Sequence, residues 1–174
     1  ATWRVDGRVT WGIESAMLAA GTNVQWLRDG LGLVPTSAAT HDIAAQCSDT
    51  GGVVYVPALM GLGTPRWDYG ARSGFFGITR GTSRAEMVRA VLEGVAHRGT
   101  DLVEAAEATG GTPITALRVD GGMSDNPTFV RALADASQRP VEIAPVREAT
   151  ALGAGLFGHL ALGTFATVDE LATT

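Results

Sequence analysis

The feature that most restricts the fold of this chain is the alternation of short apolar runs with helical patterns in its second half. "ITALRV" (114–119) is typical of a strand, residues 126–138 of a helix, "PVEIAP" (140–145) of a short strand and residues 149–162 of a helix rich in Ala, Gly and Leu. Strands that alternate with helices usually pair in parallel, because each helix carries the chain back across the sheet. The second half therefore predicts an α/β fold.

The first half predicts an antiparallel element and further helices. In "TWRVDGRVTW", Asp6 and Gly7 separate two runs rich in Trp, Val and Thr, which is typical of a β-hairpin. Residues 15–30 place apolar side chains at helical spacing and end at a glycine, so we expect a helix there. A shorter helix over residues 36–48 and a buried strand in "GGVVYVPAL" follow.

The longest predicted helix is marked at both ends. Ser83 and Glu86 have the spacing of a capping box, and apolar residues then recur on one face as far as Gly110 and Gly111. Before this helix, "GLGTPRWDYGARSG" is a long loop and "GFFGI" another strand. The 174 residues are therefore expected to form one domain, a mixed α/β sheet with helices packed on it.

Charge and composition argue against several classes of partner. A net charge of −5 without a run of Lys and Arg argues against nucleic acid and anionic membranes, because both attract clustered cations. The single cysteine, Cys47, and three dispersed histidines give no metal-ligand spacing, so we expect no structural metal. No apolar run reaches the roughly 18 residues of a membrane span, which indicates a cytoplasmic protein. Because Ala1 already lies in a strand-like run, we expect a piece of a longer protein.

Gly121 and Gly122 are the first candidate binding residues. They follow a strand at its carboxyl end, where α/β sheets bind ligands, and a residue without Cβ lets a ligand lie on the backbone. A tight strand-to-helix turn that needs positive φ explains the same two glycines equally well. The spacing alone leaves both interpretations open.

Asn126, Gly21 and Gln25 are also open to two interpretations. Asn126 before Pro127 is a good N-cap, and its side chain could also bind a purine or ribose. Gly21 lies inside the helix predicted over 15–30, where glycine costs about 1 kcal/mol relative to alanine. Gln25 is one turn further on the same face. The two residues fit a nucleobase pocket, although helix packing at Gly21 with an exposed Gln25 is the simpler explanation.

The familiar catalytic and phosphate-binding motifs are incomplete or absent. "GLGTPR" has two of the three glycines of a dinucleotide fingerprint, and there is no Walker-type or nucleophile-elbow sequence. Asp6, Asp68 and Asp120 lie near predicted turns, where carboxylates more often serve as turn or cap residues. The residues alone predict an α/β domain with a crevice that could face a nucleotide.

Four stretches, in order, resemble the C-terminal half of the FGGY carbohydrate kinases, and within them the members that act on glycerol. They are "GTNVQWLRDGLGL", the run from "VVYVPAL" to "DLVEA", "LRVDGGMSDNPTFVRALADASQRPVE" and "REATALGAGLFGHLALG". The most specific stretch, "SGFFGITRGTSRAEMVRAVLE", is similar to the second signature of the family. The loop "RWDYGAR" departs from the usual form, which reads Tyr-Trp-Asp-Pro-Tyr-Ala-Arg.

The resemblance implies an actin-like, ribonuclease-H-like fold, of which this chain is an incomplete second domain. It implies transfer of the γ-phosphoryl group of ATP to glycerol with Mg²⁺, and we also expect a homo-oligomer. Gly21, Gln25, Gly122 and Asn126 match family positions that contact the nucleotide. The family's proton-accepting aspartate and phosphate loops lie upstream of the positions that match Ala1, so we assign no catalytic or metal-binding residue here and expect the chain alone to be inactive.

Two alternatives stay open. The first is another FGGY sugar kinase, of the xylulose, ribulose or gluconate type. The second is a non-catalytic, actin-like switch that binds a nucleotide and a partner protein.

Overall fold

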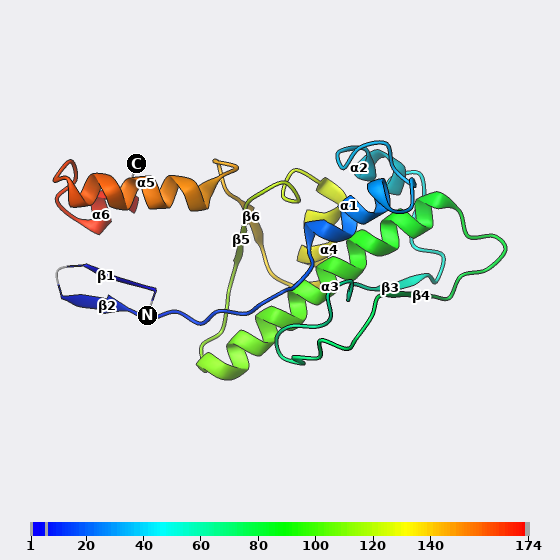
Figure 1. The fold of residues 1–174 in the computed structure, drawn as a ribbon, viewed down its shortest axis with the longest axis horizontal. Coiled ribbons are helices and arrows are strands. Elements are labelled where there is room, and N and C mark those ends of the chain that lie inside the picture. The colour runs from blue at the N-terminus through cyan, green and yellow to red at the C-terminus, as the bar shows by residue number, and fades with distance from the viewer. Residues whose placement is uncertain (1, 6, 173–174) are drawn as a thin grey trace.

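The computed structural model describes residues 2–5 and 7–172, which form two regions that we call the body and the lobe (Figure 1). The body contains four helices and two strands: α1 (Gly21–Asp29), α2 (Ala39–Ala44), α3 (Arg84–Gly110), α4 (Pro127–Ser137), β3 (Val54–Val56) and β4 (Gly74–Phe76). The lobe contains β1 (Trp3–Val5), β2 (Arg8–Thr10), α5 (Ala149–Ala161) and α6 (Val168–Ala172). Two further strands, β5 (Leu117–Val119) and β6 (Val141–Ile143), lie between the regions.

The strands pair both parallel and antiparallel, as the sequence predicts. β1 pairs with β2 and β3 with β4 in antiparallel register, whereas β5 and β6 pair in parallel. Within the described residues these are three separate two-stranded sheets rather than one mixed sheet. The predicted hairpin is present in β1 and β2, and Gly7 has a φ of 78° in its turn, but Asp6 lies outside the described residues.

α3 is the centre of the body. Its N-terminus has the predicted capping box: the Ala85 N–H donates to Ser83 Oγ at 3.2 Å, and the Ser83 N–H donates to Glu86 Oε2 at 2.6 Å. It ends at Gly111, whose φ of 65° is left-handed and favours glycine. Its buried face packs against α1, α2, α4 and β3. One hydrophobic core therefore surrounds a single long helix.

The first helix begins later than the sequence predicts. Residues 15–20 are not helical, because their hydrogen bonds go to distant residues. The Thr64 N–H donates to the Ala16 carbonyl at 3.0 Å, and the Ala16 N–H donates to Thr64 Oγ1 at 2.9 Å. The Ser15 hydroxyl donates to the Leu102 carbonyl at 3.3 Å. Gly21 is therefore the first residue of α1, and the expected cost of a glycine inside a helix does not arise.

The other predicted helices are present, with small differences in length. α4 and α5 agree with residues 126–138 and 149–162 to within one residue at each end, whereas α2 covers only the middle of residues 36–48. α6 has no counterpart in the sequence prediction.

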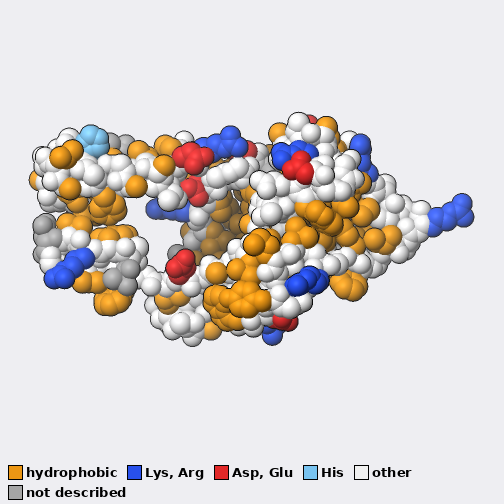
Figure 2. All heavy atoms as spheres, viewed as in Figure 1, with side chains coloured by type: hydrophobic (Ala, Val, Ile, Leu, Met, Phe, Trp, Pro, Cys, Tyr) orange, Lys and Arg blue, Asp and Glu red, His pale blue; other side chains and the backbone are white. Residues whose placement is uncertain are grey.

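The lobe is more loosely packed than the body. Trp3 of β1 and Phe157 of α5 are in contact, with ring centroids 5.7 Å apart, but α5 contains no buried residue. Figure 2 shows an opening between the lobe and the body. The lobe therefore rests on few contacts within the chain.

Candidate functional site

The two glycines after β5 differ in their reasons for being glycine. Gly121 has a φ of 79°, its N–H donates to the Arg147 carbonyl at 3.0 Å, and its carbonyl accepts from the Ser124 N–H at 3.1 Å. Gly122 is exposed and is not among the left-handed residues; a Cβ placed on it would lie 3.4 Å from Arg147 Nη2. Turn geometry therefore explains Gly121, and it leaves Gly122 as an open patch of backbone.

The start of α1 lies against this turn. A Cβ on Gly21 would meet the Met123 side chain at 3.9 Å, an ordinary contact, so packing does not require a glycine here. Ala20, at the N-cap of α1, provides no side-chain hydrogen bond, whereas α3 and α4 are both capped. An uncapped helix start presents N–H groups and the positive end of the helix dipole. The structure thus places a polar, uncapped backbone beside the exposed Gly122.

Asn126 is the N-cap of α4, as one of its two interpretations predicts. Its Oδ1 accepts from the Phe129 N–H at 3.1 Å, and its Nδ2 donates to Thr40 Oγ1 at 2.9 Å. Thr40 is fully buried in α2 and donates its own hydroxyl to the Ser37 carbonyl at 2.6 Å. Asn126 therefore joins α4 to α2 as well as capping its own helix.

Gln25 lies one turn further along α1 than Gly21, with its side chain exposed. Gly122 lies in the turn, Asn126 ends it and Gly21 touches it through Met123. Three of the four residues named from the sequence therefore surround one turn, and Gln25 extends along the adjacent helix.

Arg147 is a residue of this region that the sequence analysis does not name. Its Nη2 lies 3.0 Å from Asp125 Oδ2, and both side chains are more than half exposed. Because β5 and β6 are parallel, their carboxyl ends meet, and Arg147 after β6 lies over Gly122 after β5. The sequence does contain a signal that could have pointed to Arg147. It is a cation that follows the second of two neighbouring parallel strands, at the edge where such sheets bind ligands.

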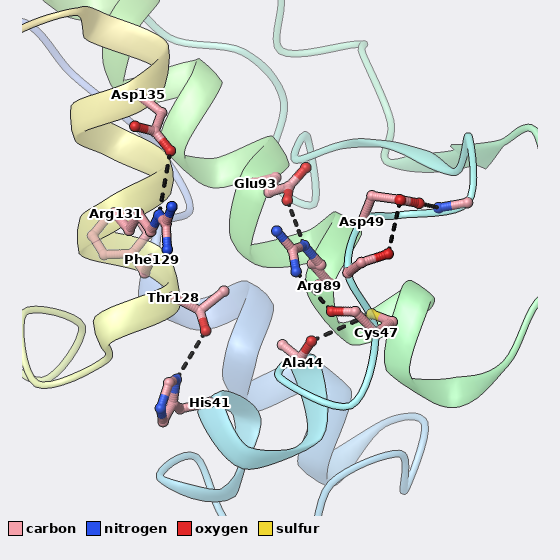
Figure 3. A network of polar contacts seen from close by, with 12 residues as sticks. His41, Ala44, Cys47, Asp49, Arg89, Glu93, Thr128, Phe129, Arg131 and Asp135 are labelled. Atoms are coloured by element: carbon pink, nitrogen blue, oxygen red, sulfur yellow. Dashed lines mark hydrogen bonds and ion pairs between the residues drawn. The ribbon is translucent and has the colours of Figure 1, made fainter.

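A polar groove of about 630 Å³ lies elsewhere, between α2, α3 and α4 (Figure 3). Its charged groups pair with one another: Arg89 Nε lies 2.7 Å from Glu93 Oε1, and Arg131 Nε lies 3.7 Å from Asp135 Oδ2. Arg89 also donates to the Cys47 carbonyl at 2.8 Å, and burial raises the pKa of the Cys47 thiol. These groups have protein partners, which is typical of a seam between helices.

Two further findings apply to residues 2–5 and 7–172. No three His, Cys, Asp or Glu side chains there are placed to hold a metal ion. No helix in that part of the chain has the length and apolar character needed to cross a membrane.

A comparison with models of protein families shows which family the chain belongs to. Residues 3–162 match the C-terminal domain of the FGGY family of carbohydrate kinases. The chain belongs to this family.

Among individual proteins of this family, the chain is similar to glycerol kinases. The chain is 42% identical over 170 residues to glycerol kinase of Geobacillus kaustophilus, covering 98% of this chain and 34% of that protein. It is 47% identical over 167 residues to glycerol kinase of Rhodospirillum centenum, covering 91% of this chain and 33% of that protein. The chain therefore spans about a third of the length of the curated relatives it matches.

Solved structures agree with this grouping. Plasmodium falciparum glycerol kinase with ADP matches with a TM-score of 0.78 and 34% identity, covering 88% of this chain and 30% of that one. Xylulose kinase of Lactobacillus acidophilus matches with a TM-score of 0.72 and 25% identity, covering 88% of this chain and 31% of that one. The expected fold class is confirmed: a partial C-terminal domain with the actin-like α/β fold of FGGY kinases.

Proposed function

We propose that this chain is the nucleotide-binding part of an ATP-dependent kinase that transfers the γ-phosphoryl group of ATP to glycerol, giving glycerol 3-phosphate. The observation that carries the proposal is the uncapped start of α1 beside the exposed Gly122 and Arg147. The similarity to glycerol kinases, one of them solved with ADP, supports the choice of ligand and substrate.

Each of the predicted residues has a separate role in this proposal. Gly122 lets the adenosine part of the nucleotide lie directly on the backbone, and Gly21 brings the N–H groups of α1 close to it. Gln25 offers an amide that can both donate and accept, and Asn126 borders the turn from the other side. Phosphoryl transfer depends mainly on positioning and charge stabilisation. Residues that hold the nucleotide in the correct position therefore contribute to the rate.

The remaining parts of the reaction are not assigned to this chain. The described residues do not fit a Mg²⁺ site, so the proposal names no metal ligand here. In the proposal, the proton-accepting aspartate and the phosphate loops belong to residues upstream of the matched positions. The proposal also places the protein in the cytoplasm, where ATP is available.

A substrate panel tests the proposal. The complete gene product is assayed with ATP and Mg²⁺ against glycerol, xylulose, ribulose and gluconate by measuring ADP release, with the purified 174-residue chain as comparison. We expect turnover with glycerol above the other three and none from the 174-residue chain. Preference for a pentulose would favour the alternative of a xylulose kinase. The similarity to a solved xylulose kinase is the reason to include these sugars. Nucleotide binding without turnover of any substrate would favour a non-catalytic switch.

A further inference from the structure

Asn23 is a fully buried polar residue in the first turn of α1. Its Nδ2 donates to the carbonyls of Ala19 at 2.8 Å and Ala20 at 3.0 Å. Its Oδ1 accepts from the Tyr55 hydroxyl at 2.8 Å. Both amide donors and the amide oxygen therefore have partners, and this pattern fixes which way the amide faces.

A fully buried asparagine needs partners for its amide. A buried amide is costly unless its hydrogen bonds are made. Here the amide holds the carbonyls of the last two residues before the helix, Ala19 and Ala20. It therefore sets the path by which the backbone reaches Gly21, where no side-chain cap is present.

Tyr55 holds Asn23 from a rigid position in β3. Its ring packs against Phe75 and Trp26, with centroids 4.7 Å and 6.2 Å away. A Cβ on Gly94 of α3 would collide with the Tyr55 carbonyl, so the strand lies directly on α3. Burial raises the pKa of the Tyr55 hydroxyl.

We propose that Asn23 and Tyr55 are positioning residues for the nucleotide. Through the carbonyls of Ala19 and Ala20 they hold the start of α1 so that its N–H groups face the Gly122 turn. The proposal rests on the nucleotide-binding function given above. Neither side chain is assigned a contact with the nucleotide itself, so their effect is on the shape of the site.

Tyr55→Phe is the direct test, because it removes the hydroxyl and keeps the ring in its aromatic cluster. In the complete gene product we expect the Kd for ADP and the KM for ATP to rise about threefold to tenfold, the size expected for one hydrogen bond. The kcat at saturating ATP should stay within about twofold, because a repositioned site that is filled still reacts. Asn23→Ala should act in the same direction, and the double variant should show less than the product of the two effects, because both single variants remove the hydrogen bond between Tyr55 and Asn23.

Two control variants separate positioning from general stability. Ile43→Val shortens a buried side chain of α2 outside this network and should lower the melting temperature without changing ADP affinity. Tyr69→Phe removes an exposed tyrosine hydroxyl and should change neither. If Tyr55→Phe is folded and binds ADP as the parent does, the inference is wrong and the proposed function stands. It is equally wrong if Ile43→Val weakens ADP binding as much. A parent protein that binds no nucleotide refutes the proposed function and the inference together.

Discussion

α3 in the body and α5 in the lobe are both rich in apolar residues, yet they are buried to very different extents. α3 has eight buried residues along its 27, although it also carries Arg, Glu and Asp side chains. α5 has 13 residues without an Asp, Glu, Lys or Arg among them, and none is buried. Apolar composition therefore shows which surface needs a partner, and it does not show that the partner lies within these residues.

The difference has a structural cause. α3 is surrounded by α1, α2, α4 and β3, which all belong to the same stretch of chain. The lobe joins the body through the extended residues 11–20 and the β5–β6 pair, and Figure 2 shows the opening beside them. The body should therefore contribute most of the free energy of folding. Substitutions in the lobe should change the free energy of unfolding of this chain only slightly.

The largest expected effect comes from matched leucine truncations in the two helices. Leu92 of α3 is fully buried, so Leu92→Ala should lower the free energy of unfolding by about 2–5 kcal/mol. Leu152 of α5 is 45% exposed, and Leu152→Ala should cost under about 1 kcal/mol. Urea unfolding of the 174-residue chain, followed by far-UV circular dichroism, measures both. Equal losses would show that the lobe is as well packed as the body.

A smaller effect is expected where the two regions meet, at Gly121 and Gly122. Gly121→Val forces a branched side chain into a left-handed φ and should cost about 1–3 kcal/mol of stability. Gly122→Val should leave the melting temperature nearly unchanged and raise the Kd for ADP of the complete gene product about tenfold. Calorimetric titration of both variants compares them directly. The assignment of Gly122 fails if the folded variant keeps its nucleotide affinity.

Most of the local structure could be predicted because its causes are local. α3 begins at the capping box of Ser83 and Glu86 and ends at the left-handed Gly111. These signals lie at the helix ends themselves, so the sequence is sufficient to place α3. Residues 15–20 were wrongly predicted as helix because Ala16 pairs with Thr64, 48 residues away. No periodicity within a short window contains that partner.

The candidate site shows the same division. Gly122 and Asn126 could be named because a strand end and a helix cap are visible in consecutive residues. Arg147 reaches the turn only through the parallel pairing of β5 with β6, and Tyr55 reaches Asn23 across 32 positions. Interactions between distant segments supply the electrostatics and rigidity of the site, and sequence patterns do not contain them.

The next expected difference between the lobe and the body is in self-association. An exposed apolar helix on a soluble chain favours association, so the 174-residue chain should sediment above its monomer mass of 18.0 kDa. Leu152→Lys in α5 should weaken this association about tenfold. Leu31→Lys, at an exposed leucine of similar accessibility that follows α1 in the body, is the matched control and should not. A parent chain that stays monomeric at all concentrations tested would show that α5 needs no cover.

The smallest effect concerns the joint that carries β5 and β6, and it is lost on acidification. Glu107, near the end of α3, accepts from the Ile114 N–H at 2.7 Å and from Arg139 Nη2 at 2.8 Å. The Ile114 hydrogen bond, followed by that of Arg139, lowers the pKa of Glu107 below its ordinary value of 4.5. A carboxyl group with a lowered folded pKa adds stability above its unfolded pKa and loses it as the pH falls through the folded one. Parent and Glu107→Gln melting temperatures should therefore differ at pH 7, with the parent higher, and converge as the pH falls below about 4.5. Other carboxyl groups titrate in both proteins and cancel in the difference. A gap that stays constant down to pH 3 would mean that Glu107 acts through packing, and that charge does not help to hold β5 and β6 against the body.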